Sequence, residues 1–192
     1  MLLNINLAVL LSTIFNMIYP GNKQYLTTNH CKDNLHCDWS VEYLYGDFAK
    51  YWDENNLWDR FPIQFLADNN EIVGAIGYTY EKNVLHIKRF FCVIHQRGKG
   101  YGRQLLEHAW EQGYNNGCNI IRMWCDRDAI PFYSNLGFNY LGVNSYEYAY
   151  VYTPILSKSM PETLNKTKHL NPFQVLKENN IPVPEEAKIF CL

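Results

Sequence analysis

The chain has 192 residues, of which 47% are hydrophobic and 19% charged, and this composition is typical of a folded globular protein. Its net charge of −2 argues against a general nucleic-acid-binding protein, which would normally be basic. Six cysteines are scattered through a chain long enough to form a core without disulfides. We therefore expect reduced thiols, a cytoplasmic location and no nucleic-acid partner.

The N-terminal stretch, residues 1–22, has two interpretations because its first charged side chain comes only at Lys23. It has no positive n-region and no small-residue cleavage site, which disfavours a signal peptide. Its polar residues fall on one side of a helical wheel, opposite Leu7, Leu10 and Ile14. We predict an amphipathic helix that ends at Pro20-Gly21 and no membrane association; a signal or anchor segment is the alternative that stays open.

The hydrophobic pattern then predicts alternating blocks of helix and strand. The expected helices are Trp39–Asn55, a helix through about Tyr114, and Asp128–Leu136; the expected strands are Ile63–Ala67, Ile72–Tyr80, Val84–Ile94, Asn119–Cys125, Phe138–Val143 and Glu147–Thr153. This order predicts an α/β (α+β) fold, a mixed sheet with helices packed on it. From Pro154 the chain becomes rich in Pro, Asn and Lys, which we interpret as an extension beyond the core domain.

A glycine-rich stretch, RGKGYG from Arg97 to Gly102, separates the third of these strands from the next helix. Such a loop directs backbone N–H groups and the positive end of the helix dipole at a ligand, which favours a phosphate. Between Lys82 and Leu106 the chain carries six Lys or Arg residues and no acid. In a chain of net charge −2, this local bias predicts a polyanionic ligand.

Two common nucleotide motifs do not fit this loop. A P-loop requires Ser or Thr after Gly-Lys, but Lys99 is followed by Gly100. The dinucleotide fingerprint fails because Arg103 stands where its third glycine should be, and because the loop follows hairpin-built strands with no evident βαβ unit.

The loop is instead similar to the Arg/Gln-x-x-Gly-x-Gly motif of the GNAT superfamily of N-acetyltransferases. About thirty residues later, the run from Ala129 to Phe138, AIPFYSNLGF, resembles the second signature of that family. The resemblance covers roughly Phe61–Thr153 and implies a mostly antiparallel central sheet flanked by helices. It implies a GNAT-like domain over residues 1–153 and an extension over 154–192; a typical first strand is not evident unless Leu2–Ile5 supplies it.

The resemblance also implies a binding site for acetyl-CoA, the acetyl donor of the family. Its pyrophosphate would be held by the loop residues Arg97, Gly98, Lys99, Gly100, Tyr101, Gly102 and Arg103, and its pantetheine arm by Phe90, Phe91 and Cys92. Many members place an Asn that contacts the cofactor seven residues before a conserved tyrosine. Here that position is Asp126, so the sequence departs from the family pattern.

The implied reaction is the direct attack of a primary amine, from a small molecule or a peptide, on the thioester in a ternary complex. Tyr133 matches the tyrosine that protonates the departing thiolate in many relatives, and a backbone N–H near Cys92 would stabilise the oxyanion. The carboxylate that some members use as a base is missing, which leaves His86 and His95 as candidate bases. A structural role for either histidine, or proton relay by water, stays open.

Other constellations are weaker. The pairs His30-Cys31 and His36-Cys37 lack the usual spacing of zinc ligands, so no metal is expected. The segment Tyr146–Tyr152, with Glu147, either lines an acceptor cleft or forms a sheet edge with exposed rings. The alternative to an enzyme is a GNAT-like module that binds CoA or a partner without turnover. A homodimer is compatible with the sequence.

Overall fold

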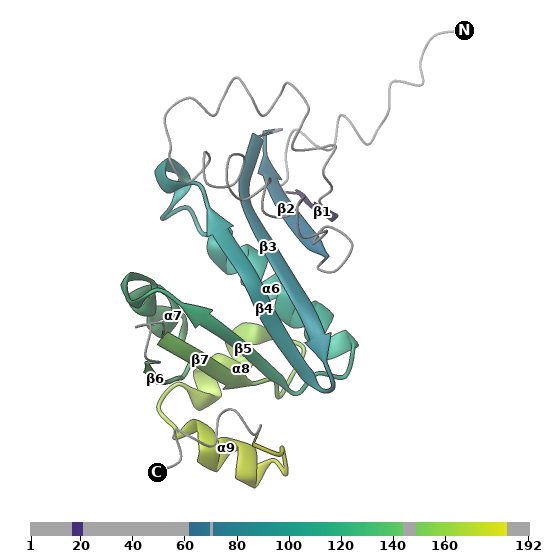
Figure 1. Ribbon diagram of the computed structural model, residues 1–192, viewed down its shortest axis with the longest axis vertical. Coiled ribbons are helices and arrows are strands. Elements are labelled where there is room, and N and C mark those ends of the chain that lie inside the picture. The colour runs from purple at the N-terminus through teal and green to yellow at the C-terminus, as the bar shows by residue number, and fades with distance from the viewer. Residues whose placement is uncertain (1–16, 21–61, 70, 144–148, 184–192) are drawn as a thin grey trace, which may run out of the picture. The chain divides into compact units, whose positions relative to one another are not determined.

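The computed structural model describes residues 17–20, 62–69, 71–143 and 149–183 (Figure 1). Its elements are β1 (Met17–Pro20), β2 (Ile63–Asp68), β3 (Glu71–Glu81), β4 (Val84–Cys92), η1 (Ile94–Gln96), α6 (Tyr101–Asn115), β5 (Ile120–Cys125), η2 (Arg127–Ala129), α7 (Ile130–Leu136), β6 (Tyr140–Val143), β7 (Ala149–Pro154), α8 (Met160–Thr167) and α9 (Pro172–Glu178). The predicted helix Trp39–Asn55 and the two His-Cys pairs lie outside the described residues.

The strands form one seven-stranded sheet in the order β1-β2-β3-β4-β5-β7-β6. Pairing is antiparallel for β1 with β2, β2 with β3, β5 with β7 and β6 with β7, and parallel for β4 with β5. This confirms the predicted mixed, mostly antiparallel sheet. The parallel pair is joined through α6, so the chain contains a βαβ connection that the hairpin-rich sequence pattern did not indicate.

The first strand corrects a prediction. Met17–Pro20 is a strand that pairs antiparallel with β2, from Met17 opposite Ala67 to Pro20 opposite Gln64; the helix predicted to end at Pro20 is wrong for these residues. β1 lies at the edge of the sheet, where a proline without an N–H is tolerated. Four residues are too few to reveal a period of two, and the pairing partner is more than forty residues away in the chain.

The chain divides into two compact units: unit 1 comprises Met1–Gly77 and Arg89–Leu105, and unit 2 comprises Tyr78–Lys88 and Leu106–Leu192. The elements β3, β4 and α6 contribute residues to both units. Unit 1 buries Phe65, Leu66 and Ile76 completely. Gly74 in the same unit allows a close approach, because a Cβ at this position would lie 2.8 Å from the Phe91 carbonyl oxygen.

The segment after Pro154 contributes to the core of unit 2. Leu176 of α9 and Ile181 pack with Val84, Ile120, Tyr150 and Tyr152 in one buried cluster. Within unit 2, Figure 1 shows β5, β7 and β6 side by side and draws α8 and α9 in yellow-green. The division of the chain into a domain and an extension at Pro154 stays a prediction.

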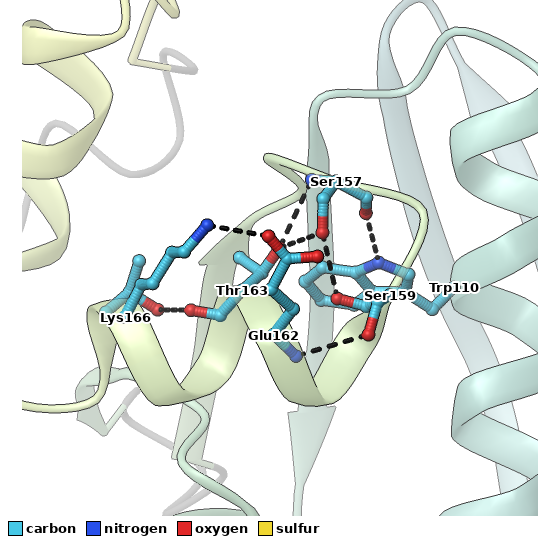
Figure 2. Close-up of polar contacts among 7 residues, drawn as sticks. Trp110, Ser157, Ser159, Glu162, Thr163 and Lys166 are labelled. Atoms are coloured by element: carbon cyan, nitrogen blue, oxygen red, sulfur yellow. Dashed lines mark hydrogen bonds and ion pairs between the residues drawn. The ribbon is translucent and has the colours of Figure 1, made fainter.

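Side-chain hydrogen bonds fix the start of α8 (Figure 2). Ser159 is the N-cap, and its hydroxyl accepts from the Glu162 N–H at 3.3 Å. The buried Trp110 indole donates to the Ser157 carbonyl oxygen at 2.9 Å, and the Ser157 N–H donates to Thr163 Oγ1 at 3.2 Å. The polar groups at this helix start are therefore paired within the protein.

No helix among the described residues is long and apolar enough to span a membrane.

Candidate functional site

The glycine loop leaves β4 after Cys92, passes through η1 and enters α6 at Tyr101. Gly98 and Gly100 have φ values of 82° and 87°, in the left-handed region that favours glycine. A Cβ at either position would meet no atom of the described residues within 4 Å, so among these residues the backbone borders open space. The role of this loop in binding a ligand stays a prediction.

The start of α6 adds positive electrostatic character to the loop. The first helical hydrogen bond runs from the Gln104 N–H to the Gly100 carbonyl oxygen at 3.1 Å, so the preceding N–H groups lie before the helical ladder begins. The first turn of α6 contains no acidic residue, and Arg97, Lys99 and Arg103 are exposed beside it. The arrangement suits an anion.

Internal hydrogen bonds shape the loop before α6. The Val93 N–H donates to the Val73 carbonyl oxygen of β3 at 3.0 Å. Arg97 Nε donates to the Cys92 carbonyl oxygen at 3.2 Å, and Lys99 Nζ donates to Gln96 Oε1 at 2.6 Å. Each contact uses one donor of a side chain that carries several, so backbone and side-chain N–H groups of the loop could both bind an anion.

Phe90, Phe91 and Cys92, the residues expected to pair with the pantetheine arm, are partly buried at the end of β4. Parallel pairing of β4 with β5 covers Val84–Ile87, and these three residues follow that paired segment in the chain. Burial raises the pKa of the Cys92 thiol to about 11, against an opposing effect of Arg97. The thiol therefore stays protonated near neutral pH, which disfavours a route in which Cys92 attacks the thioester and carries the acetyl group itself.

Tyr133, the candidate general acid, lies on α7 in unit 2 with only 4% of its surface exposed. Its ring packs edge-on against Phe132 and Phe138, with centroids 5.0 and 5.9 Å away. Gly137, in the left-handed conformation with φ 95°, ends the helix and returns the chain to Phe138. The A-x-x-F-Y-x-x-x-G-F run thus builds an aromatic setting that fixes the Tyr133 ring.

Asp126, also in unit 2, is exposed and precedes η2. Its carbonyl oxygen accepts from the Ala129 N–H at 2.9 Å, while its carboxylate makes no capping hydrogen bond to η2. The backbone of Asp126 thus contributes to the turn into α7.

The two candidate bases lie in different surroundings. His95 is exposed in η1 of unit 1. His86 lies on β4 in unit 2, where its Nδ1 is 2.7 Å from Lys88 Nζ and 3.2 Å from Arg122 Nη2. Burial, then the charges of Arg122 and Lys88, lower the pKa of His86 to about 3. Because both neighbours only donate, Nδ1 must accept and the ring proton sits on Nε2, an arrangement that disfavours His86 as a base.

The structure thus groups the predicted residues by unit. Unit 1 contains the residues predicted to pair with the pantetheine arm, the glycine loop and His95. Unit 2 contains His86, Asp126 and Tyr133. Two further contacts were not expected: Arg122 Nη2 also contacts Glu81 Oε2 at 2.8 Å, and Asp68 accepts a hydrogen bond from the Tyr101 hydroxyl. Neither contact has a signal in the sequence, since the partners are more than thirty residues apart.

The Tyr-rich segment is not a sheet edge over its described part. Tyr150 and Tyr152 are 1% and 0% exposed, and β7 lies between β5 and β6. The remaining residues of this segment, including Glu147, lie outside the described residues. The interpretation of Tyr150 and Tyr152 as exposed edge rings is therefore wrong.

Among the residues that the structure describes, no group of three or more His, Cys, Asp or Glu side chains could hold a metal ion.

Known structures share the fold of this chain. An acetyltransferase of the GNAT family from Staphylococcus aureus has a TM-score of 0.56 at 17% identity, covering 73% of this chain and 99% of that one. A Bacillus subtilis acetyltransferase in complex with CoA has a TM-score of 0.54 at 16% identity, covering 74% of this chain and all of that one.

The sequence profile of the acetyltransferase (GNAT) family matches residues 29–138, more than half of the chain. The chain belongs to the GNAT family of acetyltransferases. An uncharacterized N-acetyltransferase of Methanocaldococcus jannaschii is 28% identical over 148 residues, covering 65% of this chain and 63% of the relative. The uncharacterized protein YxbD of Bacillus subtilis is 31% identical over 126 residues, covering 63% of this chain and 67% of that protein. The chain thus spans less than two thirds of the archaeal relative.

Proposed function

We propose that this chain is an N-acetyltransferase that moves an acetyl group from acetyl-CoA to a primary amine by direct attack in a ternary complex. The observation that carries the proposal is the glycine loop between β4 and α6. Gly98 and Gly100 adopt positive φ beside open space, and α6 begins there with no acid in its first turn. A solved relative of the same fold was crystallised in complex with CoA, which supports the choice of anion.

The loop would hold the pyrophosphate of acetyl-CoA through the backbone from Arg97 to Arg103. Arg97 and Lys99 would add long-range attraction while part of their hydrogen bonding keeps the loop in shape. Phe90, Phe91 and Cys92 would pair with the pantetheine arm at the end of β4, and a backbone N–H near Cys92 would face the developing oxyanion. Asp126 would meet the cofactor through its backbone, since its carboxylate is an anion.

In the transfer, the amine nitrogen forms a bond to the thioester carbon and the carbon–sulfur bond breaks. The amine loses one proton and the departing thiolate takes one. Tyr133 would donate the proton to sulfur; a phenol with an ordinary pKa of about 10 can protonate a thiolate whose own acid has a pKa near 8.5. The packing of the Tyr133 ring against Phe132 and Phe138 supports this role, because it limits the positions of the hydroxyl.

For the amine proton, the contacts of His86 favour a structural role, in which its imidazole accepts hydrogen bonds from Lys88 and Arg122. We propose that solvent water, or the exposed His95, takes this proton. The acceptor would be a small molecule or a peptide that presents a neutral primary amine.

The first test separates an enzyme from a CoA-binding module. Calorimetric titration measures the affinity of the full chain for acetyl-CoA, and a thiol-release assay against pooled small-molecule and peptide amines measures turnover. We expect binding together with amine-dependent release of CoA. Binding without release on any amine would identify a non-catalytic module, and no binding at all would refute the role of the loop.

The second test addresses Tyr133. We expect Tyr133→Phe to retain the affinity for acetyl-CoA and to lose about 100-fold or more in kcat, because general acid catalysis contributes at least that factor. Tyr140→Phe is the matched control, since Tyr140 is 43% exposed on β6 and has no proposed role. Equal kcat for Tyr133→Phe and the parent would remove Tyr133 from the mechanism.

A further inference from the structure

Tyr101 differs from the other residues of the glycine loop because its side chain is buried. It is the first residue of α6, stands between Gly100 and Gly102, and has only 6% of its surface exposed. Its hydroxyl donates a hydrogen bond to Asp68 Oδ2. Asp68 is the last residue of β2, so this contact joins the start of α6 to a different element of unit 1.

This contact holds the downstream end of the loop. The hydrogen bonds of Gln96 with Val93, Arg97 with Cys92 and Lys99 with Gln96 are internal to the segment Cys92–Lys99. The Val93 N–H fastens the upstream end to β3 through Val73. Gly98 and Gly100 lie between the hydrogen bonds of Val93 and Tyr101. Because glycine has no side chain, the backbone here can adopt many conformations, and ligand binding costs less free energy when these are already restricted.

Asp68, which accepts the hydrogen bond from the Tyr101 hydroxyl, is held in position by strand pairing. Asp68 pairs with Glu71 across the β2–β3 hairpin, where Asn69 takes a positive φ of 50° in the turn. Because the hydrogen bond to Asp68 and then burial raise the pKa of Tyr101, its hydroxyl stays protonated and remains a donor across the working pH range. A phenol donating to a carboxylate is one of the stronger hydrogen bonds in proteins.

We propose that Tyr101 and Asp68 are positioning residues that hold the glycine loop in the conformation that binds the pyrophosphate of acetyl-CoA. The proposal rests on the proposed function. Neither side chain touches the donor; the pair acts by keeping the peptide groups around Gly100 oriented before the donor arrives. Without this hydrogen bond, a smaller fraction of the molecules has the loop in the conformation that binds CoA. The apparent affinity for CoA then falls in proportion to that fraction.

The experiment is a double-mutant cycle on the affinity of the full chain for CoA, measured by calorimetric titration. We expect Tyr101→Phe and Asp68→Ala each to weaken binding about tenfold, the factor that a hydrogen bond to a charged group typically provides. The double variant should bind as weakly as either single variant. Asp68→Asn retains an acceptor oxygen and should bind within about threefold of the parent.

Two controls separate positioning from a general loss of structure. Tyr114→Phe removes the hydroxyl of an exposed tyrosine near the other end of α6 and should leave the affinity for CoA unchanged. Pantetheine, which lacks the pyrophosphate, should bind the parent and Tyr101→Phe equally. In steady-state kinetics, the KM for acetyl-CoA should rise about tenfold in Tyr101→Phe while kcat at saturating acetyl-CoA stays within twofold.

The proposal is overturned if the parent binds CoA and Tyr101→Phe binds it equally well, or if the two single effects multiply in the double variant. It is also overturned if pantetheine binding falls in parallel with CoA binding. A parent that does not bind CoA overturns the proposed function and this inference together. Tyr101→Phe preserves the buried ring, so it decides the question if Asp68→Ala does not fold.

Discussion

The helices α6, α8 and α9 begin in different ways. Ser159 caps α8 and Asn171 caps α9, each with a side-chain oxygen that accepts a backbone N–H of the first turn. α6 has Gly100 as the first acceptor of its ladder, and glycine has no side-chain oxygen to offer. A capped helix uses its own residues to satisfy its first turn; a helix that begins at glycine leaves that turn available to a ligand.

Polar groups away from the helix starts also differ between the two units in whether they are paired within the protein. In unit 2, polar groups are used inside the protein, such as the Trp110 indole bonded to the Ser157 carbonyl and the His86 imidazole between Lys88 and Arg122. In unit 1, the loop around Gly98 and Gly100 borders open space. Substitutions in the loop should therefore alter ligand binding, whereas those in unit 2 away from Tyr133 and Asp126 should alter stability.

The largest expected effect comes from Gly100→Ala. A residue with a Cβ at φ 87° is strained by about 1–2 kcal/mol, and relief of that strain rotates the peptide groups of the loop. We expect the affinity for CoA, measured by titration calorimetry, to fall roughly 100-fold, which corresponds to about 2.7 kcal/mol.

Gly117→Ala is the matched control for this change. Gly117 also has a positive φ, 73°, and open space where a Cβ would stand, but it follows the C-terminal end of α6. It should lower the melting temperature about as much as Gly100→Ala while binding CoA like the parent. If both variants lose affinity equally, the loop is not the binding site.

A medium effect is expected from Ser159→Ala. Loss of the N-cap oxygen should reduce the free energy of unfolding by about 1 kcal/mol, measured by urea denaturation, because the Glu162 N–H loses its acceptor. The affinity for CoA should not change. Ser134→Ala, on the exposed side of α7, is the control and should alter stability by less than about 0.5 kcal/mol. A weakened affinity for CoA in Ser159→Ala would contradict the contrast between capped and open helix starts.

The last prediction is a pH dependence of stability in unit 2. The pKa of His86 is lowered from 6.5 to about 3 in the folded protein, so the unfolded chain binds the proton first. The contribution of the neutral imidazole is therefore fully present above about pH 6.5 and is lost as the pH falls toward 3. Urea denaturation at several pH values should show a shallower decline in His86→Gln than in the parent. Equal slopes for His86→Gln and the parent would contradict this prediction.

Most elements of the segment that carries the two motifs could be predicted from the sequence, because local residue patterns determine them. The strands β2 to β5, the helix α6 and the stop of α7 at Gly137 lie within a few residues of their predicted bounds. The glycine loop was recognisable because positive φ requires glycine at Gly98 and Gly100. These features depend on residue type and spacing over fewer than twenty positions.

What the sequence did not reveal depends on distant partners or on weak local signals. β1 exists through its pairing with β2, and the contacts of Tyr101 with Asp68 and of His86 with Arg122 join distant segments. The two C-terminal helices did carry a local signal. Ser159 followed by Pro161 and Glu162, and Asn171 followed by Pro172, are helix starts with a cap and an early proline, obscured by the polar composition of that segment.

Gly74 and the two loop glycines all lie in unit 1, but they are required for different physical reasons. A Cβ there would lie 2.8 Å from the Phe91 carbonyl oxygen and 2.9 Å from Leu105 Cδ1, distances that real Cβ atoms do not occupy. Gly98 and Gly100 have ample room and an unusual φ, whereas Gly74 lies within a strand and has no room. A family signature drawn only from the loop therefore includes the glycines that need a positive φ and omits Gly74, which is needed for close packing. Among homologous chains, position 74 should tolerate substitution as poorly as the loop glycines, because protein atoms occupy the space that a side chain would need.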